Sequence, residues 1–452
     1  MPAAPSADDR RRGSTPGVSR DPRHVGRDPT PPRRQWLLPL IFSVIAALVL
    51  AAGAVAGVRV VSAPPPPRLD LSLPATLAVA PGVAPAIPLP ATGSFDLVST
   101  DRGQLAAVTP SAVLPIGSIA KVMTGLVVLQ HQPLTGGEAG PAYTMTGQDV
   151  GFFNAVVAED GSSLPVTSGE QFTERQLLLA LLLPSANNIA ETLAVWVAGS
   201  ESAFVADLTT EARTLGMTQT VFADASGFSP QTVSTAADLL KLGQAALANP
   251  TLAALVATHS AVMPDGSTIQ NLDTDLSTVP GWLGIKTGST SQAGGCLLFA
   301  AEHAGPVGGS SEVTVVGAAL GVVTADGALG DELAAALSAA AAAVNAAFGA
   351  YRAVDLGTVT PPPPSGALRS AWGTSTQLQE TFEGSTSPVE LRVGATLRLS
   401  ATVLPIRDAS TVTGGTVVAR VTGRVGSTTV ATWNVTATGG LGQPNWEWLL
   451  TH

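Results

Sequence analysis

Three short motifs in this chain place a hydroxyl near an amine or an amide, at spacings that suit nucleophilic catalysis. The first is Ser118-Ile119-Ala120-Lys121. Residues three apart share one face of a helix, so we expect the Ser118 hydroxyl beside the Lys121 amine. If Ser118 lies in the first helical turn, free backbone N–H groups lie beside it and can stabilise the negative charge of an attacked carbonyl. The motif therefore predicts a serine nucleophile with a lysine as its base.

Lysine is rare in this chain, which makes its position informative. Lys121, Lys241 and Lys286 are the three lysines among 23 basic residues. A lysine that is buried or close to a second cation has a lowered pKa and can accept a proton from serine, whereas arginine keeps its proton. A chain that uses arginine elsewhere therefore has a chemical reason to keep lysine in this motif.

The second motif is Ser185-Ala186-Asn187, which directly follows the helix-ending Pro184. Loops at such positions can direct side chains into a cleft. A hydroxyl there can pass a proton to a leaving amine, and an amide can orient both a lysine and a peptide substrate. Taken alone, Ser185 and Asn187 would be better explained as helix caps.

The third motif is Lys286-Thr287-Gly288, followed by Ser289, at the end of a predicted strand. A strand edge can pair with an extended peptide. Lys286 would bring a second positive charge to the site, and Gly288 would let the backbone approach closely. The hydroxyls of Thr287 and Ser289 would be available to a terminal carboxylate.

Taken together, the three motifs indicate one catalytic cleft. Lys121 is followed by apolar Val122 and Met123, which disfavours an amine that reaches the surface. Chance matches to all three motifs, in this order and on these predicted elements, would be rare.

On these residues the chain resembles the D-alanyl-D-alanine carboxypeptidases, which are low-molecular-mass penicillin-binding proteins related to the serine β-lactamases. The resemblance covers about residues 91–350. It includes Pro115–Leu129, Leu183–Ala190, Leu215-Gly216-Met217, Asp224–Gly227 with Ser234–Leu239, and Gly284–Gly295. It implies an α+β fold with a β-lactamase-like domain, in which helices flank an antiparallel sheet. The implied reaction removes the terminal D-alanine of peptidoglycan stem peptides, and β-lactam antibiotics would be covalent inhibitors.

The resemblance also implies a role for each motif residue. Ser118 would be the acylated nucleophile and Lys121 its general base. Ser185 would pass the proton to the departing D-alanine, and Asn187 would position the substrate and the lysine. The oxyanion hole would be formed by the N–H groups of Ser118 and Ser289.

The third motif would bind the substrate's carboxylate. By resemblance, Lys286 would tune the electrostatics, while Thr287 and Ser289 would hold the carboxylate. Relatives often add an arginine after this motif, but no arginine occurs here before Arg352. We therefore expect weaker or rearranged carboxylate binding.

Composition excludes several other classes of protein. With 45% hydrophobic and 12% charged residues, the chain is not a disordered, charge-rich protein. A net charge of −10 argues against a broad nucleic-acid surface. The single cysteine, Cys296, excludes a disulfide framework, and the five histidines are scattered, so neither a metal nor a cofactor is expected.

The N-terminus predicts a membrane anchor. Residues 1–35 contain eight arginines and four aspartates. The uncharged stretch 36–58 would span roughly 34 Å as a helix, enough to cross a bilayer. The basic flank favours a cytoplasmic N-terminus and an extracytoplasmic catalytic domain. Ala54-Val55-Ala56 resembles a cleavage site, so a secreted protein is the competing interpretation.

Proline-rich stretches divide the rest of the chain. Residues 59–90 are predicted to be a spacer, 91–350 the catalytic domain, 351–366 a hinge and 367–452 a small all-β domain. Within the catalytic domain we expect a hairpin at 95–108, a buried helix at 118–131, strands at 283–287, 296–301 and 313–323, and a helix at 331–350. In the tail, Trp433, Trp446 and Trp448 could bind a sugar or a partner, but we expect them to pack a small β core.

Other functions remain open from the sequence. A β-lactamase on the same fold would need a deacylating base such as a Glu-x-x-Leu-Asn loop, and Glu191, Glu201 and Glu211 do not lie in that setting. A transpeptidase would share the acyl-enzyme, and a non-catalytic envelope binding or sensing protein could keep the fold. A Ser-His-Asp hydrolase is disfavoured because no Gly-x-Ser-x-Gly motif occurs.

Overall fold

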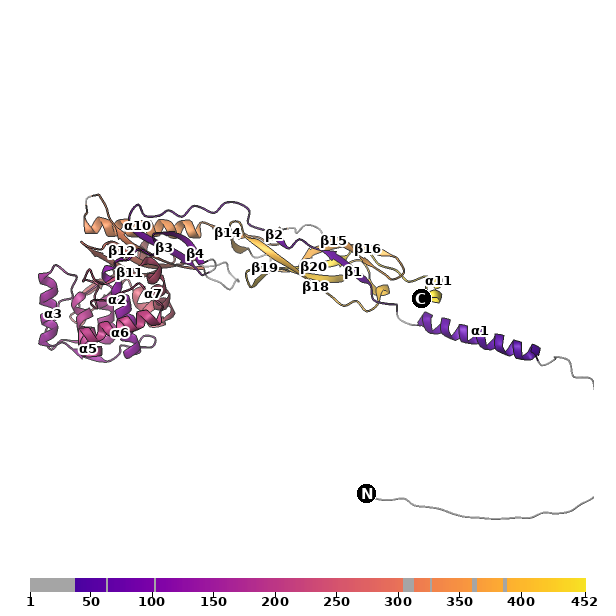
Figure 1. The fold of residues 1–452 in the computed structure, drawn as a ribbon, viewed down its shortest axis with the longest axis horizontal. Helices are drawn as coiled ribbons and strands as arrows, with labels where there is room; N and C mark the ends of the chain where they lie inside the picture. Colours follow the sequence, from indigo (N-terminus) through magenta and orange to yellow (C-terminus); the bar gives the residue numbers. More distant parts are fainter. Residues whose placement is uncertain are drawn as a thin grey trace, which may run out of the picture.

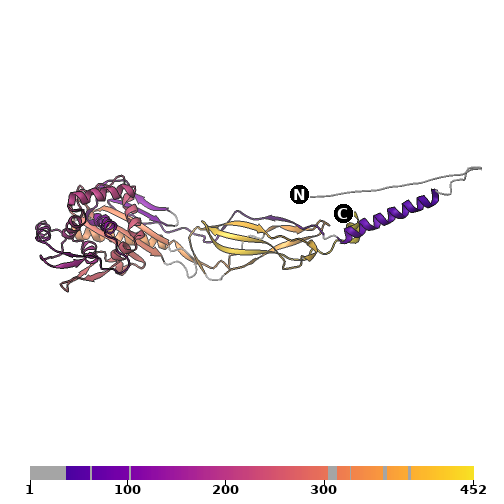
Figure 2. The same cartoon turned by 90° about the horizontal axis from the view of Figure 1, so that it is seen from below.

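The computed structural model describes residues 37–61, 64–100, 103–303, 313–325, 327–359, 364–384 and 388–452. This part of the chain is elongated, with a globular domain at one end, a β domain in the middle and helix α1 at the other end (Figures 1 and 2). The predicted basic tail, residues 1–35, lies outside the described residues.

Helix α1 (Leu37–Val61) corresponds to the predicted apolar segment. From Leu38 to Val58 its mean hydropathy is 2.5, and none of this stretch is buried against the rest of the chain. In the described part of the chain, α1 is the one continuous helix that is long and apolar enough to cross a membrane.

The globular domain is built on a five-stranded antiparallel sheet in the order β11-β12-β13-β3-β4. Its strands are β3 (Ser94–Ser99), β4 (Gly103–Val108), β11 (Trp282–Thr290), β12 (Gly294–His303) and β13 (Val313–Val322). Because β13 pairs with β3, the two ends of the domain's sequence meet in the middle of the sheet. Strand β11, which carries the third motif, lies at an edge.

Helices cover both faces of this sheet (Figure 1). One face packs against α10 (Leu329–Phe348) around Phe95, Leu297 and Phe299. The other face packs against a helical layer. That layer contains α2 (Ala120–His131), α3 (Gly147–Ala158), α4 (Glu174–Leu182), α5 (Asn187–Ala198), α6 (Glu201–Thr214), α7 (Ala236–Ala248) and α8 (Pro250–Val256). The architecture is the expected α+β fold with an antiparallel sheet flanked by helices.

Local signals in the sequence explain where these helices begin and end. Helix α2 is buried along nearly its whole length, as its apolar sequence predicts. The predicted capping box at the start of α4 is present between Thr173 and Gln176, and Pro184 follows its end. Short elements complete the domain: β5 (Leu114–Pro115), η1 (Gly117–Ile119), β6 (Ala142–Thr144), β7 (Gln171–Thr173), β8 (Val233–Ser234), β9 (Ser260–Val262), β10 (Thr268–Gln270) and α9 (Asp275–Thr278).

The start of β11 is fixed by aromatic packing. The ring of Trp282 stacks on Phe299 with centroids 5.2 Å apart and planes 3° apart. Phe299 in turn covers Gly317, where an added Cβ would lie 2.2 Å from the ring. This packing holds the strand that presents the third motif.

The β domain contains a seven-stranded sheet in the order β1-β15-β16-β20-β19-β18-β2. Its members are β1 (Arg68–Ser72), β2 (Thr76–Ala78), β15 (Ser365–Arg369), β16 (Ser375–Phe382), β18 (Thr396–Val403), β19 (Val417–Val425) and β20 (Thr428–Ala437), with η2 (Ala409–Thr411) between β18 and β19. The segment expected to be only a spacer thus supplies both edge strands. The alternating Leu69 and Leu71 of β1 pack against the β core.

The two domains are also joined by direct contacts. Strand β14 (Tyr351–Val354), which lies in the segment expected to be a hinge, pairs with β17 (Val389–Arg392) of the β domain. His303, at the end of β12, lies 2.5 Å from Glu390 and stacks on Phe348. The prolines predicted at the centre of the hinge, 361–363, lie outside the described residues.

The tail tryptophans have different environments. Trp433 is buried in the β core, as expected. In the terminal helix α11 (Trp446–Thr451), Trp446 is 73% exposed, so the expectation of a core position is wrong for this residue. Helix α11 lies against α1, at the end of the molecule far from the globular domain (Figure 1).

Glu174, the first residue of α4, allows a test of the packing. Its side chain is buried, and neither carboxylate oxygen has a hydrogen-bond partner among the described residues. Burial raises the pKa of Glu174 to about 7, although Arg175 opposes this shift. The folded state therefore binds this proton more tightly than the unfolded state, and the resulting stability is lost as the pH rises through about 7.

In the wild type, we expect the free energy of unfolding to fall between pH 6 and pH 8 as Glu174 ionises. In Glu174→Gln this fall should be smaller by about 1 kcal/mol, or about 2–4 °C in Tm. Thermal unfolding of the detergent-solubilised protein at both pH values measures this, with Glu211→Gln as the control. If wild type and Glu174→Gln lose the same stability between these pH values, burial does not raise the pKa of the Glu174 carboxyl group.

Candidate active site

The first motif spans the junction of η1 and α2. Ser118 is the middle residue of η1, and Lys121 follows one turn later in α2. The chain enters this turn through Gly117, whose φ is +51°, a conformation that favours glycine. As the spacing predicts, the Lys121 Nζ lies 2.9 Å from the Ser118 Oγ.

Lys121 is completely buried, and its amine has three polar neighbours. Besides Ser118 Oγ, Nζ donates to the Asn187 side-chain oxygen at 2.6 Å and to the Ser226 carbonyl at 2.8 Å. Two of these partners can only accept, while the Ser118 hydroxyl can also donate. A neutral amine has two N–H donors and one lone pair, which matches this set.

The electrostatics favour the neutral amine as well. Burial, reinforced by the positive charge of Lys286, holds the pKa of Lys121 well below its usual value of 10.5, and Asp224 opposes the shift. Lys241 provides a contrast, since its half-exposed amine forms an ion pair with Asp238 at 2.8 Å. Two of the three lysines therefore lie in the site, and the third has a structural role.

The second motif turns sharply between α4 and α5. Ser185 has a φ of +66°, which is strained for a residue with a side chain and is typical of functional sites. Hydrogen bonds fix the turn, because the Ala186 N–H donates to the Ala180 carbonyl and the Asn187 N–H donates to the Ser162 carbonyl. The Ser185 hydroxyl is buried without a hydrogen-bond partner among the described residues.

The third motif lies on edge strand β11, directly beside the nucleophile. A Cβ on Gly288 would lie 3.0 Å from the Ser118 nitrogen, a tight contact that favours glycine at this close approach. A Cβ on Gly117 would likewise lie 3.5 Å from the Ser289 nitrogen. The two backbone nitrogens expected to form the oxyanion hole are thus on facing segments.

Lys286 is the second buried amine of the site. It is 1% exposed and donates to the Thr287 carbonyl at 3.1 Å. Burial lowers the pKa of Lys286 to about 7, while Asp273 opposes the shift. Asp273 is itself buried and accepts a hydrogen bond from the Trp282 indole at 2.9 Å.

Sequence reasoning did not assign a role to the turn that holds Lys121 from the far side. Ser226 supplies the carbonyl, and Asp224 orders the turn by accepting from the Ser226 hydroxyl at 2.6 Å and the Phe228 N–H at 2.9 Å. At Gly227, with φ +76°, a Cβ would lie 1.9 Å from the Gly117 oxygen. The Asp-x-Ser-Gly pattern at 224–227 was the available signal, but it does not reveal a backbone contact.

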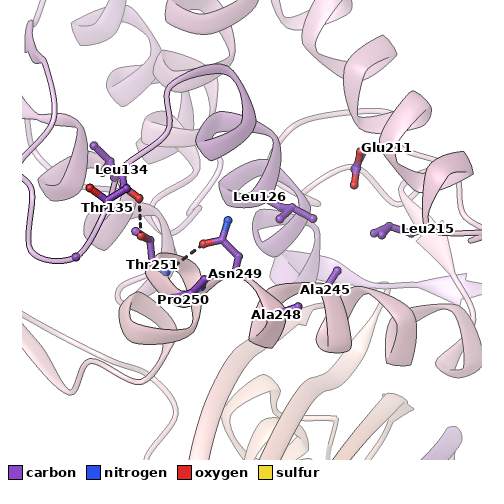
Figure 3. A pocket seen from close by; sticks show the side chains of 11 residues that line it. Leu126, Leu134, Thr135, Glu211, Leu215, Ala245, Ala248, Asn249, Pro250 and Thr251 are labelled. Carbon is purple, nitrogen blue, oxygen red and sulfur yellow. Dashed lines mark hydrogen bonds between the residues drawn. The ribbon is translucent and has the colours of Figure 1, made fainter.

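A cavity of about 640 Å³ lies apart from these motifs, between α2, α6 and α7 (Figure 3). Leu126, Leu215 and Ala245 give it apolar walls, and the Thr251 hydroxyl donates to the Leu134 carbonyl at 2.7 Å at one end. None of the motif residues lines it, so the catalytic groups are not directed there.

Comparison with known proteins identifies the family. The sequence profile described as D-alanyl-D-alanine carboxypeptidase matches residues 88–311. A D-alanyl-D-alanine carboxypeptidase of Mycobacterium tuberculosis is 33% identical over 231 residues, which cover 49% of this chain and 75% of the relative. The chain belongs to the D-alanyl-D-alanine carboxypeptidase family. It is a serine peptidase of the penicillin-binding type, as the resemblance implied.

Other similar proteins carry related names. A D-alanyl-D-alanine endopeptidase of Pseudomonas aeruginosa is 33% identical, with 53% of this chain and 72% of the relative covered. A solved structure of the Streptomyces K15 DD-transpeptidase is 27% identical, covers 60% of this chain and 99% of its own, and has a TM-score of 0.48.

The base can be tested by a substitution that keeps the charge. We expect Lys121→Arg to lower the rate of acylation by penicillin by at least about 10³-fold, because the guanidinium keeps its proton. Stopped-flow acylation measures this rate, and Lys241→Arg is the matched control outside the site. Near-wild-type acylation of Lys121→Arg would contradict the role of the amine.

Proposed function

We propose that this carboxypeptidase acts through an acyl-enzyme on Ser118, with Lys121 as the general base. The observation that carries this proposal is the buried Lys121 amine, 2.9 Å from the Ser118 hydroxyl and fixed by two carbonyl oxygens. The amine would take the hydroxyl proton as Ser118 attacks the carbonyl between the two terminal D-alanines. The facing N–H groups of Ser118 and Ser289 would stabilise the oxyanion.

The second motif would complete the proton path. When the tetrahedral intermediate collapses, the bond to the terminal D-alanine breaks and its nitrogen needs a proton. The unpartnered hydroxyl of Ser185 is suited to pass it from Lys121. Asn187, whose oxygen binds Lys121, would use its amide nitrogen to hold a substrate carbonyl. Water would then hydrolyse the acyl-enzyme and restore Ser118.

Binding of the terminal carboxylate is assigned to β11. Lys286 would provide the positive charge, and Thr287 and Ser289 would provide hydroxyls. The arginine that relatives often add is absent, and His303, in the region where it would lie, is already engaged with Glu390. Lys286 would therefore supply most of the electrostatic attraction for the substrate's terminal carboxylate.

We also propose a single-pass topology, with the N-terminus cytoplasmic and the catalytic domain outside. The apolar, unburied α1 and the basic residues before it support this. The β domain lies between α1 and the globular domain, so it would hold the active site away from the membrane (Figure 2). We propose the domain boundaries predicted from the sequence, with one change. Residues 59–90 supply strands β1 and β2 to the β domain.

The acyl-enzyme gives a direct test of function. We expect benzylpenicillin to form a long-lived adduct on Ser118, because the site acylates readily and deacylates slowly. Intact-mass spectrometry and peptide mapping locate the adduct, and Ser118→Ala should form none. Release of D-alanine from a stem pentapeptide, measured with and without an added amine, then separates hydrolysis from transfer. An adduct on another residue would overturn the assignment.

The low pKa of Lys286 predicts a pH dependence. Lys286 is cationic below a pH of about 7 and neutral above it, so attraction of the substrate carboxylate weakens as the pH rises. We expect the ratio of acylation rates for benzylpenicillin over its methyl ester to fall about tenfold between pH 7 and 8.5. Lys286→Arg should remove this dependence because arginine stays charged. A constant ratio in the wild type would refute the assignment of the carboxylate to Lys286.

A further inference from the structure

One buried acid beside the third motif has no role in the mechanism proposed above. Asp273, just before α9, is 3% exposed. Its Oδ2 accepts a hydrogen bond from the Trp282 indole at 2.9 Å, and its Oδ1 accepts one from the Asp275 N–H at 3.2 Å. Both donors are neutral, and the ion pairs recorded among the described residues do not include Asp273. A buried carboxylate with only neutral partners is costly to ionise, so its charge needs a cation nearby.

The segment that carries Asp273 is fixed to the catalytic elements on both sides. The Leu272 N–H donates to the carbonyl of Leu183, two residues before the second motif, at 3.3 Å. On the other side, Asp273 holds the indole of Trp282, the first residue of β11. Lys286 lies four residues further along the same strand. The carboxylate therefore has a fixed place relative to the third motif.

Lys286 is the cation on which this carboxylate acts. Burial lowers the pKa of Lys286 to about 7, and the negative charge of Asp273 opposes that shift. Burial raises the pKa of Asp273 to about 6, and the positive charge of Lys286 opposes it in turn. The two groups form no direct ion pair, since Lys286 donates to the Thr287 carbonyl and Asp273 accepts from Trp282. A charge that acts from a distance through the protein interior favours the ammonium form without occupying its N–H donors.

The other ionisable groups on elements packed against β11 act elsewhere. Lys121 on α2 is the amine whose pKa the charge of Lys286 lowers. Asp275 on α9 acts on Asp273, and Glu332 on α10 acts on the buried thiol of β12. Neither η1 nor α8 carries an ionisable side chain. Asp273 is therefore the acid that supports the charge of Lys286.

We propose that Asp273 is a positioning residue for carboxylate binding: its buried negative charge keeps Lys286 in the ammonium form, which attracts the substrate's terminal carboxylate near neutral pH. The proposal rests on the carboxypeptidase function and on the role of Lys286 proposed above. It adds the group that sets the protonation state of that lysine. Asp273 acts on the substrate through Lys286 and not by contact.

The first test measures the proton on Lys286 directly. Asp273→Asn removes the charge and keeps an oxygen that can accept from Trp282. In full-length, detergent-solubilised protein with ¹³C,¹⁵N-labelled lysine, the Lys286 signal should titrate about 1 pH unit lower than in the wild type, because a nearby opposite charge favours the charged form. Asp275→Asn, which removes the neighbouring charge on α9, should leave this midpoint unchanged. An unchanged midpoint in Asp273→Asn overturns the proposal.

The second test measures the consequence for the carboxylate. With a midpoint about 1 pH unit lower, the cationic share of Lys286 at pH 7 falls from about one half to about one tenth. The ratio of acylation rates for benzylpenicillin over its methyl ester should therefore fall about fivefold in Asp273→Asn. In a Lys286→Arg background the same substitution should leave the ratio unchanged, because arginine keeps its proton. An equal fall in that background would show a merely structural role and contradict the proposal.

A reciprocal measurement does not need a folded Asp273→Asn variant. Coupling between two sites is mutual, so Lys286→Met should raise the midpoint of the Asp273 carboxyl by about 1 pH unit, as followed by ¹³C NMR of labelled aspartate. A carboxyl that titrates identically with and without Lys286 overturns the proposal. These titrations require no turnover, so their failure leaves the Ser118 mechanism standing. The absence of a penicillin adduct on Ser118 would instead overturn the proposed function.

Discussion

The site depends on one constraint, the complete burial of the Lys121 amine beside the Ser118 hydroxyl. A charged ammonium in this position would lose its hydration, and Lys286 adds a second positive charge nearby. Both effects favour the neutral amine, and two carbonyl oxygens orient it toward Ser118. In the mechanism we propose, this position would let an ordinary lysine act as a base without a histidine. The rest of the domain must therefore exclude water from the Lys121 amine.

Three separate segments provide this enclosure. Helix α2 carries the amine, the turn after α4 brings Asn187 over it, and the 224–227 turn closes the far side. Close backbone contacts at Gly227 and Gly288 press this turn and strand β11 against η1. These contacts involve residues more than 100 positions apart, so the site forms only when sheet and helical layer are assembled. The strained backbone of Ser185 is consistent with a turn held by this assembly.

The sequence predicted the family and its reaction better than it predicted how distant segments pack around the site. Motif spacing predicted that the side chains of Ser118 and Lys121 face one another, because local helix geometry decides this. The carbonyl of Ser226 was missed because any residue type supplies a backbone oxygen. Strands β1 and β2 were missed because prolines around them masked short alternating segments whose partners lie about 300 residues later. The exposure of Trp446 was missed because tryptophan usually indicates a core.

The proposed mechanism depends on the protonation state of one amine, and the scarcity of lysine makes that state measurable. With only three lysines in the chain, NMR titration of ¹³C,¹⁵N-labelled lysine side chains gives few signals, and Lys121→Arg and Lys286→Arg assign them. We expect the signal lost in Lys121→Arg to report a neutral amine at pH 7 and to titrate well below the usual 10.5. If that signal instead reports an ammonium until the pH approaches 10.5, Lys121 is not the base and the account is wrong.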